Sequence, residues 1–159
     1  MVPLFDLTRQ YQSLKTELDA AVLGLLASGQ YVMGPAVEDF EAAAAQELGV
    51  KHAIGVANGT DALQIALRAL KLQPGDEVIT SPFSFYSAAE VVAELGGKPV
   101  FVDIEADTFN IDPAQLEAAI TPRTRAIIPV HIFGHPAPME AINAIAKKHG
   151  LGVIEDSAQ

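Results

Sequence analysis

From residue 51 onward, segments with strand character alternate with segments of helical character, and no other feature of the sequence constrains the fold as much. The strand segments are short apolar runs, as expected for strands that are buried on both faces. We predict strands at 51–57, 77–80, 99–104, 125–130 and 151–155, and helices at 59–70, 86–95, 113–120 and 139–149. This rhythm is typical of an α/β fold in which helices cover both faces of a mostly parallel sheet.

Two local signals support the helix boundaries. Asp112 precedes Pro113, which favours a helix start, because the aspartate side chain can cap the first turn and proline fits the first helical position. The pair Gly96-Gly97 follows the helix at 86–95 and is expected to end it.

The first third of the chain has a different pattern. Helical segments at about 10–27 and 36–48 follow each other without a strand between them, and a turn-rich stretch at 28–35 separates them. We therefore expect these helices to pack outside the sheet or against another subunit. The sequence is divided accordingly into a helical N-terminal segment, 1–50, and a sheet-containing segment, 51–159.

Composition limits the classes of function. Half of the 159 residues are hydrophobic, which suits a globular chain of about one domain. Twenty acidic residues against ten basic ones give a net charge of −10, which argues against a nucleic-acid partner. No apolar run approaches the roughly 20 residues that span a bilayer, and the N-terminus lacks a signal-peptide pattern, so we expect a cytoplasmic protein with no membrane association. Cysteine is absent and the histidines lack metal-ligand spacing, so no metal site is assigned.

A candidate phosphate site lies between the strand predicted at 51–57 and the helix that follows it. The helix begins with Gly59, Thr60 and Asp61, and a helix start offers unpaired N–H groups and the positive end of the helix dipole to an anion. Gly59 lets a ligand approach the backbone closely, and Thr60 can add a hydroxyl donor. The same residues are compatible with an ordinary turn in which Asn58 or Thr60 caps the helix.

A second candidate feature is a group of aromatic residues at the carboxyl end of the strand at 77–80. These residues are Phe83, Phe85 and Tyr86, in a chain of which only 6% is aromatic. An aromatic face at this point could stack on a planar heterocycle, although such side chains also serve as ordinary core residues.

A third candidate feature follows the last predicted strand, where Asp156 and then Gln159 occur. Parallel α/β sheets bind ligands beyond the carboxyl ends of their strands. A carboxylate there could hold a cationic ring nitrogen in its protonated form, and the glutamine could hydrogen-bond a ring substituent. A helix cap or a salt bridge would also account for the aspartate.

Taken together, a phosphate site, an aromatic face and a carboxylate for a ring nitrogen describe pyridoxal phosphate. A nicotinamide-dependent Rossmann enzyme is disfavoured, because the turn before the helix at 59–70 lacks the Gly-x-Gly-x-x-Gly fingerprint. A loop and a covering helix would normally follow the strand at 151–155, so we expect the chain to be cut off beside this site.

Five motifs in the order of a known family agree with this interpretation. They are the segments 58–63 (NGTDAL), 75–80 (GDEVIT), 83–85 (FSF), 129–134 (PVHIFG) and 155–159 (EDSAQ). With these motifs, nearly the whole chain resembles the DegT/DnrJ/EryC1/StrS family of pyridoxal-phosphate-dependent nucleotide-sugar aminotransferases. The resemblance implies a large domain of the aspartate-aminotransferase type, fold type I. Residues 51–159 would be the first part of this cofactor-binding domain, with its remainder and the C-terminal domain absent.

The resemblance also implies how the N-terminal part of the site binds the cofactor. Gly59, Thr60 and Asp61 would bind the cofactor phosphate, largely through backbone N–H groups. Phe85 would stack on the pyridine ring, with Tyr86 as the alternate residue for this role.

At the other end of the chain, Asp156 would pair with the pyridinium nitrogen, which makes the cofactor an electron sink, and Gln159 would contact the 3-hydroxyl of the ring. In family members the lysine that forms the Schiff base lies downstream of this motif. None of the lysines here fits that position, including Lys147 and Lys148. We therefore expect that the chain of 159 residues does not catalyse transamination by itself.

The complete enzyme implied by the resemblance would move an amino group, usually from glutamate, to a nucleotide-linked keto sugar for polysaccharide precursors. The segment 129–137 looks most like members that act on 3-keto derivatives of UDP-N-acetylglucosaminuronic acid. Family members are homodimers with shared active sites, so the two N-terminal helices would serve a partner. Two alternatives remain open. One is a sugar dehydratase of the same family with a histidine in place of the lysine, and the other is a non-catalytic remnant or binding module.

Overall fold

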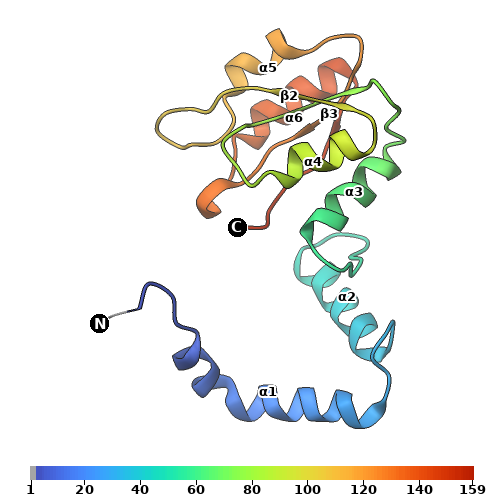
Figure 1. The fold of residues 1–159 in the computed structure, drawn as a ribbon, viewed down its shortest axis with the longest axis vertical. Helices are drawn as coiled ribbons and strands as arrows, with labels where there is room; N and C mark the ends of the chain where they lie inside the picture. The colour runs from blue at the N-terminus through green and yellow to red at the C-terminus, as the bar shows by residue number, and fades with distance from the viewer. Residues whose placement is uncertain (1–2) are drawn as a thin grey trace. The chain divides into compact units, whose positions relative to one another are not determined.

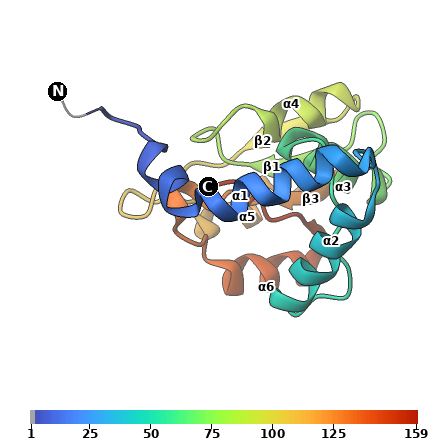
Figure 2. The same cartoon turned by 90° about the horizontal axis from the view of Figure 1, so that it is seen from below.

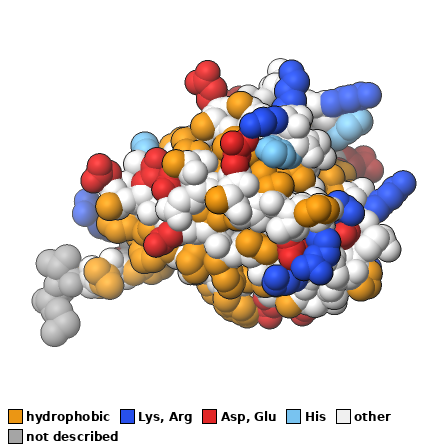
Figure 3. Space-filling view, turned by 90° about the horizontal axis from the view of Figure 1, so that it is seen from above, with side chains coloured by type: hydrophobic (Ala, Val, Ile, Leu, Met, Phe, Trp, Pro, Cys, Tyr) orange, Lys and Arg blue, Asp and Glu red, His pale blue; other side chains and the backbone are white. Residues whose placement is uncertain are grey.

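The computed structural model describes residues 3–159, and the chain divides into two compact units between Gly55 and Val56. Within the described residues, no helix is both long enough and apolar enough to cross a membrane. On the face drawn in Figure 3, acidic and basic side chains are mixed, with apolar side chains between them.

The N-terminal unit contains the two helices α1 (Thr8–Ser28) and α2 (Pro35–Glu47), which confirms the helices predicted at 10–27 and 36–48. Gly29 ends α1 in the left-handed conformation, with φ of 68°. Gly34 precedes α2, and a Cβ atom at this position would lie 2.8 Å from the carbonyl oxygen of Gln30. None of the described residues of α1 or α2 is buried.

The C-terminal unit is built on a four-stranded parallel sheet with the strand order β2-β1-β3-β4. The strands are β1 (Glu77–Thr80), β2 (Lys98–Phe101), β3 (Thr124–Ile128) and β4 (Gly152–Val153). They confirm the predicted parallel sheet, although β2, β3 and β4 are shorter than predicted. Isolated bridges occur where the predicted strands would have continued, and one of them joins Val130 to Asp156 in parallel.

Helices cover both faces of this sheet, as predicted. The four helices are α3 (Gly59–Ala69), α4 (Ser87–Glu94), α5 (Pro113–Ala119) and α6 (Met139–His149). Val78 of β1 packs in one hydrophobic cluster with residues of α3 and α4. The next residue, Ile79, packs in a second cluster with residues of α5 and α6, because successive side chains of a strand point to opposite faces. Figure 2 shows α4 and α6 on opposite sides of the strands.

The local signals for helix ends are confirmed. The side chain of Asp112 accepts a hydrogen bond of 2.9 Å from the N–H of Ala114, and Pro113 is the first residue of α5. Gly96 follows α4 with φ of 76°, a conformation that glycine adopts without steric cost.

The strand predicted at 51–57 is wrong, because residues 52–56 form neither a helix nor a strand. A strand needs a neighbouring strand to take up its N–H and C=O groups, and no strand pairs with this segment within residues 3–159. The N–H of Gly55 donates instead to the Glu41 carboxylate, at 2.6 Å. Apolar residues such as Ile54 made a strand the expected structure, but this pattern does not show whether a neighbouring strand is present to pair with it.

A buried carboxylate anchors the edge of the sheet at which the strands begin, here called the amino edge. The side chain of Glu77, the first residue of β1, is only 2% exposed. It accepts hydrogen bonds from Thr121 at 2.6 Å, Arg123 at 2.9 Å and Lys98 at 3.3 Å. The Thr121 hydroxyl and the two cations lower the pKa of Glu77 to about 2, against the effect of burial. The charge at this edge is therefore satisfied within the protein.

Candidate active site

The candidate site lies at the opposite edge of the sheet, where the parallel strands end, here called the carboxyl edge. α3 ends shortly before β1 begins, so the N-terminus of α3 lies toward the edge at which β1 ends. The short 3-10 helix η1 (Ile132–Gly134) follows β3 and lies beside the C-terminal residues at the same edge (Figure 1). Ligands of open parallel sheets bind in this position.

The N-terminus of α3 has the features of an anion site. Asn58 is the N-cap, and its Oδ1 accepts the N–H of Asp61 at 2.9 Å. Its carbonyl oxygen accepts the N–H of Ala62 at 3.1 Å. The N–H groups of Gly59 and Thr60 have no acceptor among the described residues. Two donors at the positive end of a helix dipole are thus available to a ligand.

The structure shows which residue caps this helix, as the ordinary-turn interpretation expected of Asn58 or Thr60. Asn58 caps the helix, so the hydroxyl of Thr60 is not needed for capping. A Cβ atom at Gly59 would meet no protein atom within 4 Å, so the space above the backbone is open. Gly59 and Thr60 therefore fit a phosphate group. The N–H of Asp61, which the resemblance implied as a third donor, is instead bonded to Asn58.

Phe85 and Tyr86 lie at the carboxyl edge between β1 and α4. Their ring centroids are 4.7 Å apart with planes inclined by 56°, and both side chains are 62% exposed. They are therefore not core residues of this unit, and either ring is accessible for stacking on a planar ligand.

Asp156 is held at this edge by backbone hydrogen bonds to the segment that follows β3. Its N–H donates to the carbonyl oxygen of Pro129 at 2.9 Å, and its carbonyl oxygen accepts the N–H of His131 at 3.0 Å. Oδ1 of its carboxylate accepts the N–H of Ala158 at 3.2 Å. Gln159 is joined to the same segment, because its Oε1 accepts the N–H of Phe133 at 3.0 Å. The structure therefore brings the two predicted C-terminal site residues together with the turn that contains η1.

Both ring nitrogens of His131 contact other residues at this edge. The N–H of Ala137 donates to Nδ1 of His131 at 3.0 Å, so Nδ1 is an acceptor in this arrangement. Nε2 lies 3.0 Å from Glu155, the neighbour of Asp156 in the chain. Residues 3–159 contain no group of three or more side chains arranged to hold a metal ion.

Two further aromatic residues at this edge were missed. Phe109, in the loop after β2, stacks on Phe83 with 5.6 Å between ring centroids. Phe133 of η1 contacts both rings edge-on, at 6.2 and 6.0 Å. These three rings come from three separate loops, and no local sequence pattern links them.

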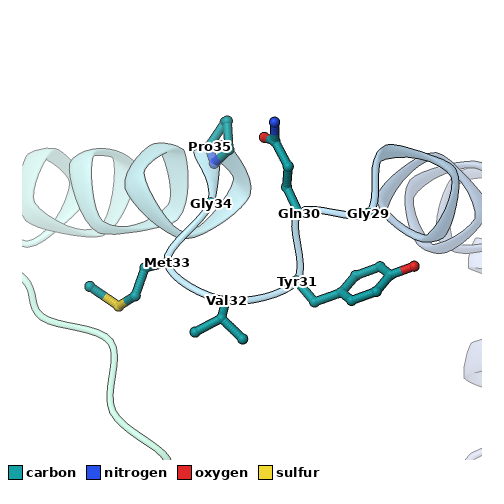
Figure 4. A pocket seen from close by; sticks show the side chains of 7 residues that line it. All are labelled: Gly29, Gln30, Tyr31, Val32, Met33, Gly34 and Pro35. Atoms are coloured by element: carbon teal, nitrogen blue, oxygen red, sulfur yellow. The ribbon is translucent and has the colours of Figure 1, made fainter.

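The loop between α1 and α2 forms a hollow of about 400 Å³, lined by residues 29–35. Figure 4 shows Gln30 and Pro35 on one side of this loop and Tyr31, Val32 and Met33 on the other. Apart from the Tyr31 phenol, the lining has no ionisable side chain. This hollow therefore lacks the acidic and basic groups that the candidate site at the carboxyl edge contains.

Comparison with known proteins gives a consistent result. Residues 12–159 match the DegT/DnrJ/EryC1/StrS aminotransferase family. The UDP-2-acetamido-2-deoxy-3-oxo-D-glucuronate aminotransferase of Pseudomonas aeruginosa is 53% identical over 159 residues, which cover 100% of this chain and 44% of that protein.

Solved structures show the same likeness. The X-ray structure of DesV from S. venezuelae superimposes with a TM-score of 0.96 at 47% identity, over 99% of this chain and 43% of that one. NtdA from Bacillus subtilis, solved with bound cofactor PMP, has a TM-score of 0.93 at 39% identity, over 99% of this chain and 37% of that one. The chain therefore spans less than half the length of these relatives.

Proposed function

Because this chain belongs to the DegT/DnrJ/EryC1/StrS aminotransferase family, we propose that it forms the first part of the pyridoxal-phosphate-binding domain of a sugar aminotransferase. The observation that carries the proposal concerns the N–H groups of Gly59 and Thr60, which have no acceptor within residues 3–159 and lie toward the same sheet edge as Asp156. A cofactor with a phosphate at one end and a ring nitrogen at the other suits these groups. Bound pyridoxal phosphate supplies an electron sink for transamination.

Each candidate residue has a distinct part in this proposal. Gly59 and Thr60 bind the phosphate through their N–H groups, and Asp61 supports them through its hydrogen bonds with Asn58. Phe85 stacks on the ring, with Tyr86 as the alternate.

The C-terminal residues contact the other end of the cofactor. The carboxylate of Asp156 keeps the ring nitrogen protonated, because an adjacent negative charge favours the charged form of a base. Gln159 donates a hydrogen bond to the 3-oxygen of the ring.

The substrate is a keto sugar linked to a nucleotide, and glutamate is the amino donor. Support for the sugar comes from the relative in Pseudomonas aeruginosa, whose name specifies a 3-oxo sugar acid linked to UDP. We further propose a cytoplasmic homodimer. The dimer is supported by the exposed apolar side chains of α1, which include Leu18, Val22 and Leu23.

The proposal is tested on the full-length protein with two assays. Titration with pyridoxamine phosphate, followed by its fluorescence, measures cofactor binding. Production of 2-oxoglutarate from glutamate, in the presence of UDP-linked 3-keto sugars, measures amino transfer. We expect saturable binding and amino transfer. Both should be weakened by Thr60→Val, which keeps the N–H group of this residue but removes the hydroxyl that adds a further donor to the phosphate. A protein that binds no cofactor, or that transfers no amino group to any nucleotide-linked keto sugar, would overturn the proposal.

A further inference from the structure

We propose that Asn110, which has no assigned role, is a positioning residue that clamps the turn at 130–137 and thereby holds Asp156 and Gln159 in place for the cofactor ring. This inference rests on the proposed function, because the ring is the ligand that these two residues would meet. It adds to that function a residue that does not itself touch the cofactor.

The side chain of Asn110 joins two segments that are far apart in the sequence. The residue is 1% exposed and lies in the loop between β2 and α5. Its Oδ1 accepts the N–H of Ile132 at 3.2 Å. Its Nδ2 donates to the carbonyl oxygens of His135 and Pro136, at 3.1 Å each. Only a side-chain amide can accept at one end and donate twice at the other, so this contact is specific to the residue type.

The clamped turn contacts both cofactor-facing residues through its backbone. The N–H of His131 donates to the carbonyl oxygen of Asp156, and the N–H of Phe133 donates to Oε1 of Gln159, at 3.0 Å each. An N–H donor can pair only with the oxygen of an amide, so Phe133 fixes which end of the Gln159 side chain is the donor. Nε2 is then the end available to the 3-oxygen of the ring.

The backbone of the turn is strained, which explains why a clamp is needed. Phe133 has φ of 55° and Phe109, the neighbour of Asn110, has φ of 60°. Bulky residues rarely adopt this left-handed conformation, and they keep it only where the surroundings enforce it. The rings of Phe109 and Phe133 meet edge-on at 6.0 Å, and both contact Phe83. The aromatic cluster and the Asn110 amide thus fix the same turn from two sides.

The alternative is that Asn110 only stabilises the fold, and a matched control separates the two roles. Glu77 is also buried and also bonds three partners, but it lies at the amino edge. Both Asn110→Ala and Glu77→Gln are expected to lower the melting temperature of the full-length protein. Only a change that moves Asp156 and Gln159 should weaken cofactor binding. Asn110→Ser introduces a hydroxyl that can replace one of the three hydrogen bonds, so it is the milder variant if Asn110→Ala does not fold.

The experiment measures the Kd for pyridoxamine phosphate and amide hydrogen exchange of the cofactor-free protein. We expect the Asn110 variants to raise Kd by about ten-fold or more and to lower the protection of the Phe133 N–H, whereas Glu77→Gln leaves both unchanged. The Ile132 N–H is a poorer probe, because it also donates to the carbonyl oxygen of Val130 at 3.0 Å. When an Asn110 variant is combined with Gln159→Ala, the loss of affinity should be less than additive, since both changes act through the turn at 130–137.

Unchanged Kd in Asn110→Ser, or an equal rise in Glu77→Gln, would overturn the positioning role. Retained hydrogen-exchange protection of the Phe133 N–H in a folded Asn110 variant would also overturn the positioning role, and this result does not depend on cofactor binding. A wild-type protein that binds no pyridoxamine phosphate would instead overturn the proposed function, and this inference with it.

Discussion

The two edges of the parallel sheet differ in how their polar groups are used. At the amino edge, the buried carboxylate of Glu77 has three donors from the protein itself. At the carboxyl edge, two N–H groups of α3 have no acceptor among the described residues, and Phe85 and Tyr86 are largely exposed. One edge is thus complete within the chain, while the other offers groups to a ligand.

Along the same strands, the groups that stabilise the fold and the groups open to a ligand lie at opposite ends. β1 begins at Glu77, which fixes the start of the sheet, and runs through a core that is buried on both faces. It then leads into the aromatic loop of the carboxyl edge. Two of the four described non-glycine residues with positive φ, Phe109 and Phe133, lie at that edge, and such strained residues are common at functional sites. Changes at the amino edge should therefore alter stability, and changes at the carboxyl edge should alter ligand binding and turnover.

The largest expected effect is that of Asp156→Asn in the full-length protein. The amide cannot stabilise a protonated ring nitrogen as a carboxylate does, so turnover should fall on the order of 10²-fold. Cofactor should still bind, and the melting temperature should change little, because the Oδ1 contact with the N–H of Ala158 is conserved. Steady-state kinetics with spectroscopic cofactor quantitation checks this. Wild-type turnover in the variant would remove Asp156 from the proposed role.

The next effect is at the amino edge and depends on pH. The pKa of Glu77 is about 2 in the folded protein, below its ordinary value of 4.5. The carboxylate therefore stabilises the fold fully above pH 4.5, and this contribution is lost as the pH falls toward 2. Glu77→Gln should lower the melting temperature at pH 7 and flatten its fall between pH 4.5 and 2. Thermal melts across this range test the expectation, and parallel curves for the two proteins would contradict it.

A smaller effect is expected from Asn58→Ala at the start of α3. Loss of the cap that accepts the N–H of Asp61 should cost about 1 kcal/mol of unfolding free energy. It should also weaken the binding of pyridoxamine phosphate, because the first turn of α3 then frays. Denaturant unfolding and cofactor titration measure the two effects. Asn58→Ser, which retains a capping oxygen without placing a second carboxylate beside Asp61, is the control for stability. Equal stability of the alanine variant and the wild type would show that the cap is unimportant.

The smallest effect should come from Lys148→Ala. Lys148 and His149 of α6 lower the pKa of Glu117 by hydrogen bonding, with Lys148 making the larger contribution. All three side chains are partly exposed to solvent, where ion pairs contribute little. We expect a melting temperature within about 1 °C of the wild type. A drop as large as that of Glu77→Gln would show that burial is not what distinguishes the two carboxylates.

The fold was largely predictable because its signals are local. α6 occupies the predicted residues 139–149, and Asp112 caps α5 as expected. The strand at 51–57 was predicted wrongly, because a local pattern does not show whether a partner strand exists elsewhere in the chain.

The candidate site was predictable only in part. Asp156 and the start of α3 follow from the rule that ligands bind at the carboxyl ends of parallel strands. A ring contact of Gln159 was predicted from its place three residues after Asp156, but the 3-hydroxyl as its partner came from the family resemblance. Asn110 was missed because its three partners lie 22 to 26 residues further along the chain, and no periodicity records such contacts.

A crystal structure of the full-length protein with pyridoxamine phosphate tests the central claim most directly. We predict that the phosphate accepts hydrogen bonds from the N–H groups of Gly59 and Thr60, and that the Asp156 carboxylate lies within hydrogen-bond distance of the ring nitrogen. A cofactor bound away from the carboxyl edge, or with its phosphate remote from the start of α3, would contradict the account.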